Sequence, residues 1–352
     1  MQIKNLNCKN FRNLKNIEIF PDSQMNVICG ENAQGKTNIL EAIWLFTGAK
    51  SFRFSKDNAF VNFDKEKAKN EITFISGGVE NKAQIIFSDN KEAFLNDKKL
   101  SNTAKLSGNF NAVIFEPNDL SIIKEGPEKR RRFLDICIGQ LYPKYIDILR
   151  DYHRAVLQRN KIIKEYKYDP TVSVMLDIFE EKIASNGTKI REYRKKYLLN
   201  QKDYLIDIYS GLSEKREKIS AEYVYNDEDI SLGLINSRRE DMYSSVTSVG
   251  PHRDDIEFKI NGNNVRNFGS QGQKRSVALA LKFAQAEIIK EQTGEYPVFL
   301  LDDVMSELDV KRQNFVLNHI NGWQSFITCC DPSSVERLKK GKIFEVKNGE
   351  IL

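Results

Sequence analysis

The sequence predicts an α/β nucleotide-binding fold with an antiparallel β-meander and a helical insertion. Three observations support this prediction: a glycine-rich phosphate-loop pattern between an expected strand and an expected helix, short strand-like segments near the N-terminus, and a long central region of helical periodicity. The chain has 352 residues, of which 40% are hydrophobic and 29% are charged, as in globular proteins. This length suffices for one large domain or two ordinary domains.

Composition argues against several classes of protein. The chain has no apolar run of about 18 residues, so we expect no membrane-spanning helix, and its polar N-terminus lacks the apolar segment of a secretory signal. The five cysteines form no Cys-x-x-Cys pair and there are only three histidines, which argues against a zinc site and fits a reducing cytoplasm. The net charge of +5 permits nucleic-acid binding if positive side chains cluster on one surface.

The first third of the chain is expected to be rich in strands. Its segments alternate in polarity or form short apolar runs, and glycine, asparagine and aspartate turns separate the later ones, which predicts an antiparallel meander. The expected strands are 16–20, 25–29, 71–76, 83–88, 92–97 and 112–117, the last of them ended by Pro117.

The central region is expected to be helical. Tyr145, Ile148, Leu149 and Tyr152 recur at helical spacing, and 178–199 has the pattern of a long amphipathic helix rich in Lys and Arg. These patterns predict an inserted antiparallel helix pair or a small bundle. Alternatively, the helices simply cover the sheet.

The last quarter returns to an α/β pattern. Residues 255–265 predict a hairpin that turns at Asn261-Gly262, and 269–292 predict a glycine-rich turn followed by a long helix. The apolar runs 298–303 and 325–330 are typical of strands buried on both faces.

The phosphate-loop pattern carries the strongest chemical signal. Gly30-x4-Gly35-Lys36-Thr37 lies between an expected strand and the apolar helix that follows it, so backbone N–H groups and the helix N-terminus can surround phosphate oxygens. Lys36 should reach the β- and γ-phosphates, and the Thr37 hydroxyl should bind Mg²⁺. The predicted ATP-binding residues of this loop are Gly30, Glu31, Asn32, Ala33, Gln34, Gly35, Lys36, Thr37 and Asn38.

Two further segments complete the predicted site. Asp302 and Asp303 end a buried strand, where Asp302 can hold Mg²⁺ and Asp303 can orient or deprotonate a water molecule. Ser270, Gly272 and Gln273 open a long helix, with Ser270 as N-cap and Gly272 permitting close approach of a phosphate. Alone, either segment is also typical of an ordinary helix cap or loop.

The order of these blocks resembles that of the ABC-type ATPases, in the chromosome-associated branch that includes SMC proteins and the RecF family of bacterial recombination mediators. The resemblance implies an ABC-type ATPase head of two lobes, a P-loop sheet plus an antiparallel β-meander, with an inserted helical arm domain. The head would comprise 1–120 and 247–352, and the arm 121–246. The segments most similar to RecF are 10–14 (NFRNL), 117–135 (PNDLSIIKEGPEKRRRFLD), 248–255 (SVGPHRDD), 269–276 (GSQGQKRS) and 300–309 (LLDDVMSELD).

This resemblance also implies an ATP-dependent homodimer. Two ATP molecules would lie between head-to-tail protomers, each bound by one phosphate loop and by Ser270 and Gly272 of the partner subunit, so that hydrolysis releases the dimer. Residues 306–309 resemble a loop that crosses the dimer interface, and Arg12 resembles an arginine that reaches the phosphates in related heads.

The sequence departs from the broader ABC pattern at two catalytic positions. Asp303 replaces the usual glutamate, and Cys330 lies about where the switch histidine would be. Both departures predict slow hydrolysis, suited to a switch rather than a motor. The resemblance implies that DNA stimulates this hydrolysis. Asn118 and Glu116 are the candidates for the family's glutamine loop.

Membership of the RecF type would imply DNA and protein partners. The resemblance implies binding of double-stranded and gapped DNA, action with RecR and RecO in loading RecA, and roles in repair, recombination, replication and the SOS response. Each cluster of positive charge could equally be a solvated or ion-paired surface. The candidate DNA contacts are Arg53, the run Lys129 to Arg132 that includes Arg130, and the helix bearing Lys189, Arg191, Arg194, Lys195 and Lys196.

Other functional classes are less consistent with the sequence. An SMC-like structural tether needs arms far longer than an insertion of about a hundred residues. A nuclease-associated DNA-tethering ATPase of similar head design would be expected to carry a nuclease metal cluster or a zinc-binding Cys pair, and neither pattern is evident in the sequence. A second phosphate-facing helix start argues against a small-molecule kinase, and the RecF-like segments argue against a transporter motor.

Overall fold

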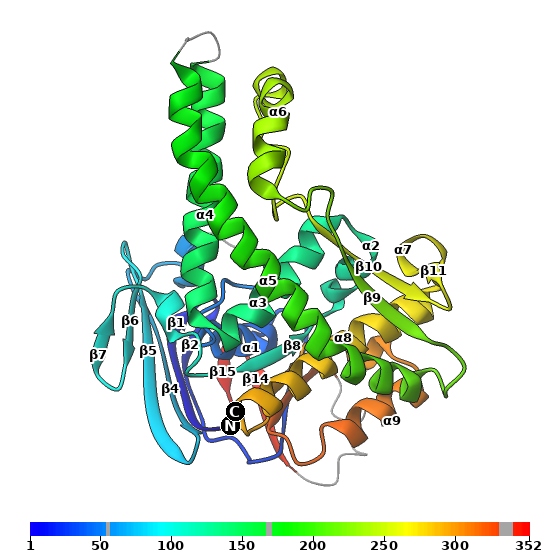
Figure 1. Ribbon diagram of the computed structural model, residues 1–352. Helices are drawn as coiled ribbons and strands as arrows, with labels where there is room; N and C mark the ends of the chain where they lie inside the picture. The colour runs from blue at the N-terminus through cyan, green and yellow to red at the C-terminus, as the bar shows by residue number, and fades with distance from the viewer. Residues whose placement is uncertain (54–56, 167–170, 331–340) are drawn as a thin grey trace. The chain divides into compact units, whose positions relative to one another are not determined.

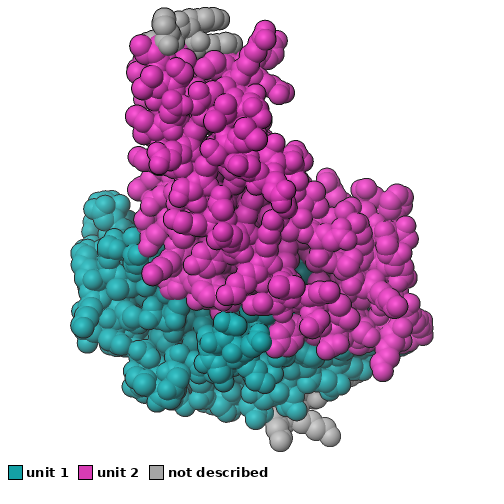
Figure 2. Space-filling view, in the orientation of Figure 1, with its two compact units in different colours: residues 1–119, 279–352 teal, residues 120–278 magenta. Residues whose placement is uncertain are grey.

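Two six-stranded sheets are built from the two ends of the chain. The computed structural model describes residues 1–53, 57–166, 171–330 and 341–352, and within them both sheets belong to unit 1, which comprises Met1–Asp119 and Leu279–Leu352 (Figure 1). Figure 2 shows unit 1 in teal and unit 2, Leu120–Ala278, in magenta.

The strands and helices before residue 120 are β1 Gln2–Phe11, β2 Leu14–Ile19, β3 Met25–Cys29, α1 Lys36–Leu45, β4 Ala68–Ser76, β5 Val79–Phe87, β6 Glu92–Leu95, β7 Lys98–Leu100 and β8 Ala112–Phe115. Unit 2 holds α2 Ser121–Lys124, α3 Pro127–Leu141, α4 Pro143–Glu165, α5 Val172–Leu212, β9 Ile219–Val224, α6 Ile230–Ser244, β10 Asp255–Ile260, β11 Asn263–Asn264, α7 Val265–Phe268 and the start of α8. The remaining elements are α8 Gln271–Thr293, β12 Val298–Leu301, α9 Val310–His319, β13 Ser325–Cys329, β14 Lys342–Lys347 and β15 Glu350–Ile351, with short 3-10 turns at Asp57–Phe60, Thr103–Leu106, Pro117–Leu120 and Met305–Glu307.

The first sheet is antiparallel and has the order β2-β1-β4-β5-β6-β7. The predicted meander is confirmed, because β4, β5 and β6 pair in sequence. Strand β1 was not predicted. Its inward side chains Ile3, Leu6, Cys8 and Phe11 are fully buried, but these positions do not follow every second residue, and a register shift after Ile3 accounts for the first break in the alternation.

The second sheet holds the nucleotide site and has the order β15-β14-β3-β13-β12-β8. Strands β14, β3, β13, β12 and β8 run parallel, so their carboxyl ends lie at one edge. Every residue of β12 and β13 is buried, which explains why both read as continuous apolar runs in the sequence. Strand β13 lies between β3 and β12, and this order could not be read from the sequence.

Unit 2 contains the predicted helix pair. The expected helix 178–199 lies within α5, which packs antiparallel to α4: Tyr145 contacts Tyr193, whereas Arg159, further along α4, bonds to Glu180 (Figure 1). Strand β9 occupies the end of the region that was expected to be helical, and it pairs with β10. Unit 2 extends to Ala278, whereas the arm was predicted to end at residue 246. We find no helix of membrane-spanning length and apolarity among the described residues.

Arg159 joins three elements of unit 2 through buried polar contacts. Its guanidinium is fully buried and donates to Glu180 Oε1 at 2.9 and 3.0 Å, to Asp241 Oδ2 at 2.7 Å and to Thr247 Oγ1 at 3.0 Å. Removing it would leave buried Asp241 without its cation and Glu180 paired with Arg238 alone, and an uncompensated buried carboxylate costs more than the pair itself contributes.

Arg159→Leu should therefore lower the free energy of unfolding by about 3–5 kcal/mol. The measurement is urea denaturation followed by circular dichroism. Arg154, on the same helix with 72% of its side chain exposed, provides the matched control, and Arg154→Leu should change stability by less than about 0.5 kcal/mol. Equal effects of the two substitutions would contradict a structural role for the buried network.

Candidate nucleotide site

The phosphate loop connects β3 to α1 and requires glycine at two positions. Gly30 has φ +153°, and a Cβ there would lie 2.3 Å from the carbonyl oxygen of Val346 on β14. Gly35 has φ +119°, and a Cβ there would lie 2.8 Å from side-chain atoms of Asn13 and Leu14. Side chains at either position would push the loop off its neighbouring strands, so both glycines are needed for the loop conformation.

Lys36 folds back over the loop. Its Nζ donates to the carbonyl oxygens of Gly30 at 2.5 Å and Glu31 at 2.9 Å, and it lies 3.5 Å from the Sγ of Cys330. Cys330 follows β13, and its Sγ is 3.1 Å from Asn32 Oδ1. The strand order thus brings Cys330 to the phosphate loop, beside the ammonium group expected to bind phosphate.

Asp302 lies directly across from Thr37. The Thr37 hydroxyl donates to Asp302 Oδ1 at 2.9 Å, and the Thr328 hydroxyl on β13 donates to the same oxygen at 3.0 Å. Burial raises the pKa of Asp302 above its ordinary value, and these two hydrogen bonds oppose that rise. The predicted metal residues Thr37 and Asp302 are therefore together, although 265 positions separate them.

Asp303 is exposed and adopts a left-handed backbone conformation, with φ +51°. Its N–H donates to Thr328 Oγ1 at 2.8 Å, and its carbonyl oxygen accepts from Ser306 Oγ at 2.8 Å. These bonds hold the peptide groups on both sides of the Asp303 Cα, while the residue stays exposed. The arrangement is suited to a group that orients water.

Arg12 is held against α1 in this structure. Its Nε and Nη2 donate to the two oxygens of buried Glu41 at 2.9 and 2.7 Å, and its Nη1 donates to the Ala59 carbonyl at 3.0 Å. Arg53 lies beside this pair and donates to Asn38 Oδ1 at 2.5 Å. Sequence reasoning missed Glu41 and Thr328. The available signal was a charged or polar residue within an otherwise apolar helix or strand.

Ser270 and Gln273 cap α8 reciprocally, within unit 2. The Ser270 N–H donates to Gln273 Oε1 at 2.7 Å, and the Gln273 N–H donates to Ser270 Oγ at 3.2 Å. This geometry is a capping box and confirms Ser270 as the helix N-cap. Because the Ser270 oxygen acts as acceptor here, its own proton stays available to a ligand.

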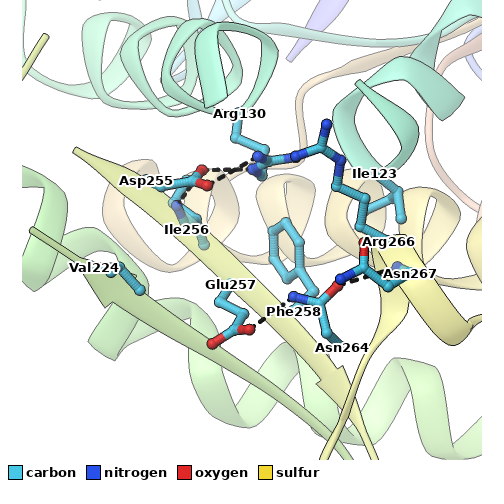
Figure 3. A pocket seen from close by; sticks show the side chains of 10 residues that line it. All are labelled: Ile123, Arg130, Val224, Asp255, Ile256, Glu257, Phe258, Asn264, Arg266 and Asn267. Carbon is cyan, nitrogen blue, oxygen red and sulfur yellow. Dashed lines mark hydrogen bonds and ion pairs between the residues drawn. The ribbon is translucent and has the colours of Figure 1, made fainter. Parts of the chain in front are cut away.

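Several arginines predicted to contact DNA are buried in ion pairs of unit 2. Arg130 is 3% exposed and donates to both oxygens of Asp255 at 2.6 and 2.9 Å, beside a cavity of ≈ 250 Å³ (Figure 3). Arg191 pairs with Asp254 and Arg194 with Asp135 in the same way. The structure therefore removes Arg130, Arg191 and Arg194 from the candidate DNA contacts, because their donors already serve carboxylates.

Other predicted DNA residues remain at the surface. Lys195 is exposed, and its Nζ donates to the Tyr225 hydroxyl at 2.9 Å. The Nζ of Lys129 lies 3.6 Å from Glu125 Oε2, and the Arg53 side chain is 45% exposed. Their placement leaves these three side chains accessible to solvent in part or whole.

Comparison with known proteins identifies the family. The description "RecF/RecN/SMC N terminal domain" matches residues 2–351. The DNA replication and repair protein RecF of Clostridium acetobutylicum is 41% identical over 364 residues, covering 100% of this chain and 99% of that protein. The corresponding protein of Listeria monocytogenes is 38% identical over 370 residues, covering 100% and 99%.

Solved structures give the same result at the level of the fold. A structure of the recombination mediator protein RecF-ATP in the RecFOR pathway has a TM-score of 0.92 and 37% identity, covering 100% of this chain and 97% of that one. A Pyrococcus furiosus Smc head domain has a TM-score of 0.57 and 18% identity, covering 100% and 96%, which supports the fold alone. The full-length match, together with the convergence of the phosphate loop and Asp302, shows that the chain belongs to the RecF family of DNA replication and repair proteins, with an SMC-like ABC ATPase fold.

Proposed function

We propose that this protein is a slow, DNA-stimulated ATPase that dimerises on ATP, binds duplex and gapped DNA, and helps load RecA at single-stranded gaps together with RecR and RecO. The observation that carries the proposal is the Thr37–Asp302 hydrogen bond beside Lys36, which supports a phosphate and metal site at the carboxyl ends of β3 and β12, the strands on either side of β13. Relatives named for DNA replication and repair support the cellular role.

The site is chemically suited to Mg²⁺ and ATP. Thr37 and Asp302 offer the oxygen donors that Mg²⁺ prefers, and Gly30 and Gly35 permit the backbone conformation of the phosphate loop. Bound Mg²⁺ would neutralise charge on the β- and γ-phosphates. Lys36 would exchange its bonds to the Gly30 and Glu31 carbonyls for phosphate oxygens, and Asp303 would orient the attacking water.

Dimerisation would use the second helix start. The Ser270 oxygen accepts from the Gln273 N–H, so the hydroxyl proton of Ser270 can be donated to the γ-phosphate of a nucleotide on another protomer. ATP would then link two copies, and loss of the γ-phosphate would release them.

DNA binding would use exposed lysines rather than the buried arginines. Lys182, Lys189 and Lys196 recur at every seventh residue of α5 and are all exposed, so they lie along one face at spacings of about 10 Å. Contacts of this type bind the phosphate backbone without reading sequence, and their affinity should fall as salt rises.

The central test is sedimentation with and without ATP, Mg²⁺ and gapped DNA. We expect the wild-type protein to become dimeric with MgATP, and Lys36→Met to stay monomeric because it lacks the phosphate-binding ammonium group. Lys98→Met, at an exposed position on β7, should dimerise normally. A dimer of the Lys36 variant that forms equally well with ATP would contradict the shared-nucleotide proposal.

A further inference from the structure

Thr328 is a buried polar residue within an apolar strand. It lies on β13 and is 1% exposed, between buried neighbours Ile327 and Cys329. Strand β13 pairs in parallel with β12, where Leu301 is opposite Ile327. Asp302 and Thr328 are the residues that follow this pair, so the Thr328 hydroxyl lies against the Asp302 carboxylate.

The Thr328 hydroxyl donates one hydrogen bond and accepts another. A carboxylate only accepts hydrogen bonds, so the Thr328 proton goes to Asp302 Oδ1 at 3.0 Å, and an oxygen lone pair accepts the Asp303 N–H at 2.8 Å. One side chain thus connects the proposed metal residue to the peptide of the proposed water-orienting residue. The direction of both bonds is determined by the chemistry of the groups.

The bond to Asp303 restrains a strained position. Asp303 has φ +51°, a conformation that costs a non-glycine residue on the order of 1 kcal/mol or more. The Thr328 oxygen accepts from the Asp303 N–H, and the Ser306 hydroxyl donates to the Asp303 carbonyl oxygen at 2.8 Å, so the peptide groups on both sides of the Asp303 Cα are held. Without the hydroxyl, the peptide could relax and turn the Asp303 carboxylate away.

We propose that Thr328 is a positioning residue for ATP hydrolysis. Its hydroxyl group donates to the Asp302 carboxylate and accepts from the Asp303 N–H, and these two bonds fix the positions of Asp302 and Asp303 relative to each other. The inference rests on the proposed ATPase function. Thr37 also donates to Asp302 Oδ1, but Thr37 is expected to give its oxygen to the metal, whereas Thr328 continues to orient the carboxylate.

The test compares Thr328→Val, which keeps the shape and removes the hydroxyl, with Thr328→Ser, which retains the hydroxyl. In Thr328→Val at saturating Mg²⁺, we expect kcat to fall about 10–100-fold, with the KM for ATP within about threefold of wild type and ATP-dependent dimerisation preserved. Thr328→Ser should restore kcat to within about threefold of wild type. Thr73→Val, on β4 of the other sheet, is the control for loss of a threonine hydroxyl.

A second measurement tests the positioning role of Thr328 without requiring ATP hydrolysis. Mn²⁺ binding in the presence of a non-hydrolysable ATP analogue, followed by electron paramagnetic resonance, should weaken about tenfold or more in Thr328→Val and recover in Thr328→Ser. Absence of ATP hydrolysis by the wild-type protein would contradict the proposed function. Independently of that result, unchanged Mn²⁺ affinity in Thr328→Val would overturn the positioning role. A kcat loss that serine does not restore would overturn it as well.

Discussion

Asp303→Asn should lower kcat for ATP hydrolysis about 100-fold or more, while ATP binding and ATP-dependent dimerisation persist. The carboxylate is the group expected to orient and deprotonate water, and general-base catalysis typically contributes a factor of 10²–10⁴. Asparagine preserves the size of the side chain and tolerates the left-handed backbone at φ +51°, so the substitution removes charge with little change of shape.

Phosphate release and sedimentation would be measured on the same samples. Dimers should accumulate in Asp303→Asn because hydrolysis, which releases them, is slow. Asp97→Asn is a matched control, since Asp97 is exposed and also has a left-handed conformation, with φ +63°. Turnover by Asp303→Asn at the wild-type rate would mean that another residue activates the water.

Ser270→Arg should bind ATP with nearly wild-type affinity yet remain monomeric. The phosphate loop is intact in this variant, whereas the bulky cationic side chain replaces the hydroxyl that would reach the γ-phosphate on a second protomer. The substitution also removes the N-cap of α8, which costs about 1 kcal/mol and is too small to unfold the protein.

Fluorescent-nucleotide binding and light scattering distinguish the two effects. Ser231→Arg introduces the same side chain into the exposed first turn of α6 and should dimerise with ATP like the wild-type protein. If Ser270→Arg formed ATP-dependent dimers at wild-type concentrations, no contact in trans through this serine would be required, and the dimer would have to use other surfaces.

Local signals were sufficient for most of the framework. The strand 25–29, the glycines of the loop and the helix after it follow from short patterns, because glycine conformation and hydrophobic periodicity act over a few residues. The N-cap at Ser270 was predicted for the same reason. Strand β1 was missed because its register shifts and its buried positions therefore do not alternate strictly.

Charges were predicted less well than strands and helices. The sequence showed a run of arginines after residue 129 and a basic helix near 190, both typical of DNA-binding surfaces. In the structure Arg130, Arg191 and Arg194 pair with Asp255, Asp254 and Asp135. A positive side chain has the same appearance in a sequence whether or not a distant carboxylate neutralises it.

The amino-acid sequence by itself determined the phosphate loop, the acidic strand end and the capped helix, because each is a short segment whose chemistry depends on adjacent residues. Only the tertiary structure placed β13 between β3 and β12, and so brought Thr328 and Cys330 to Asp302 and Lys36. It also decided which arginines are buried. Both outcomes depend on pairing between residues far apart in the chain, which is set by packing of the whole sheet or helix layer and has no local pattern.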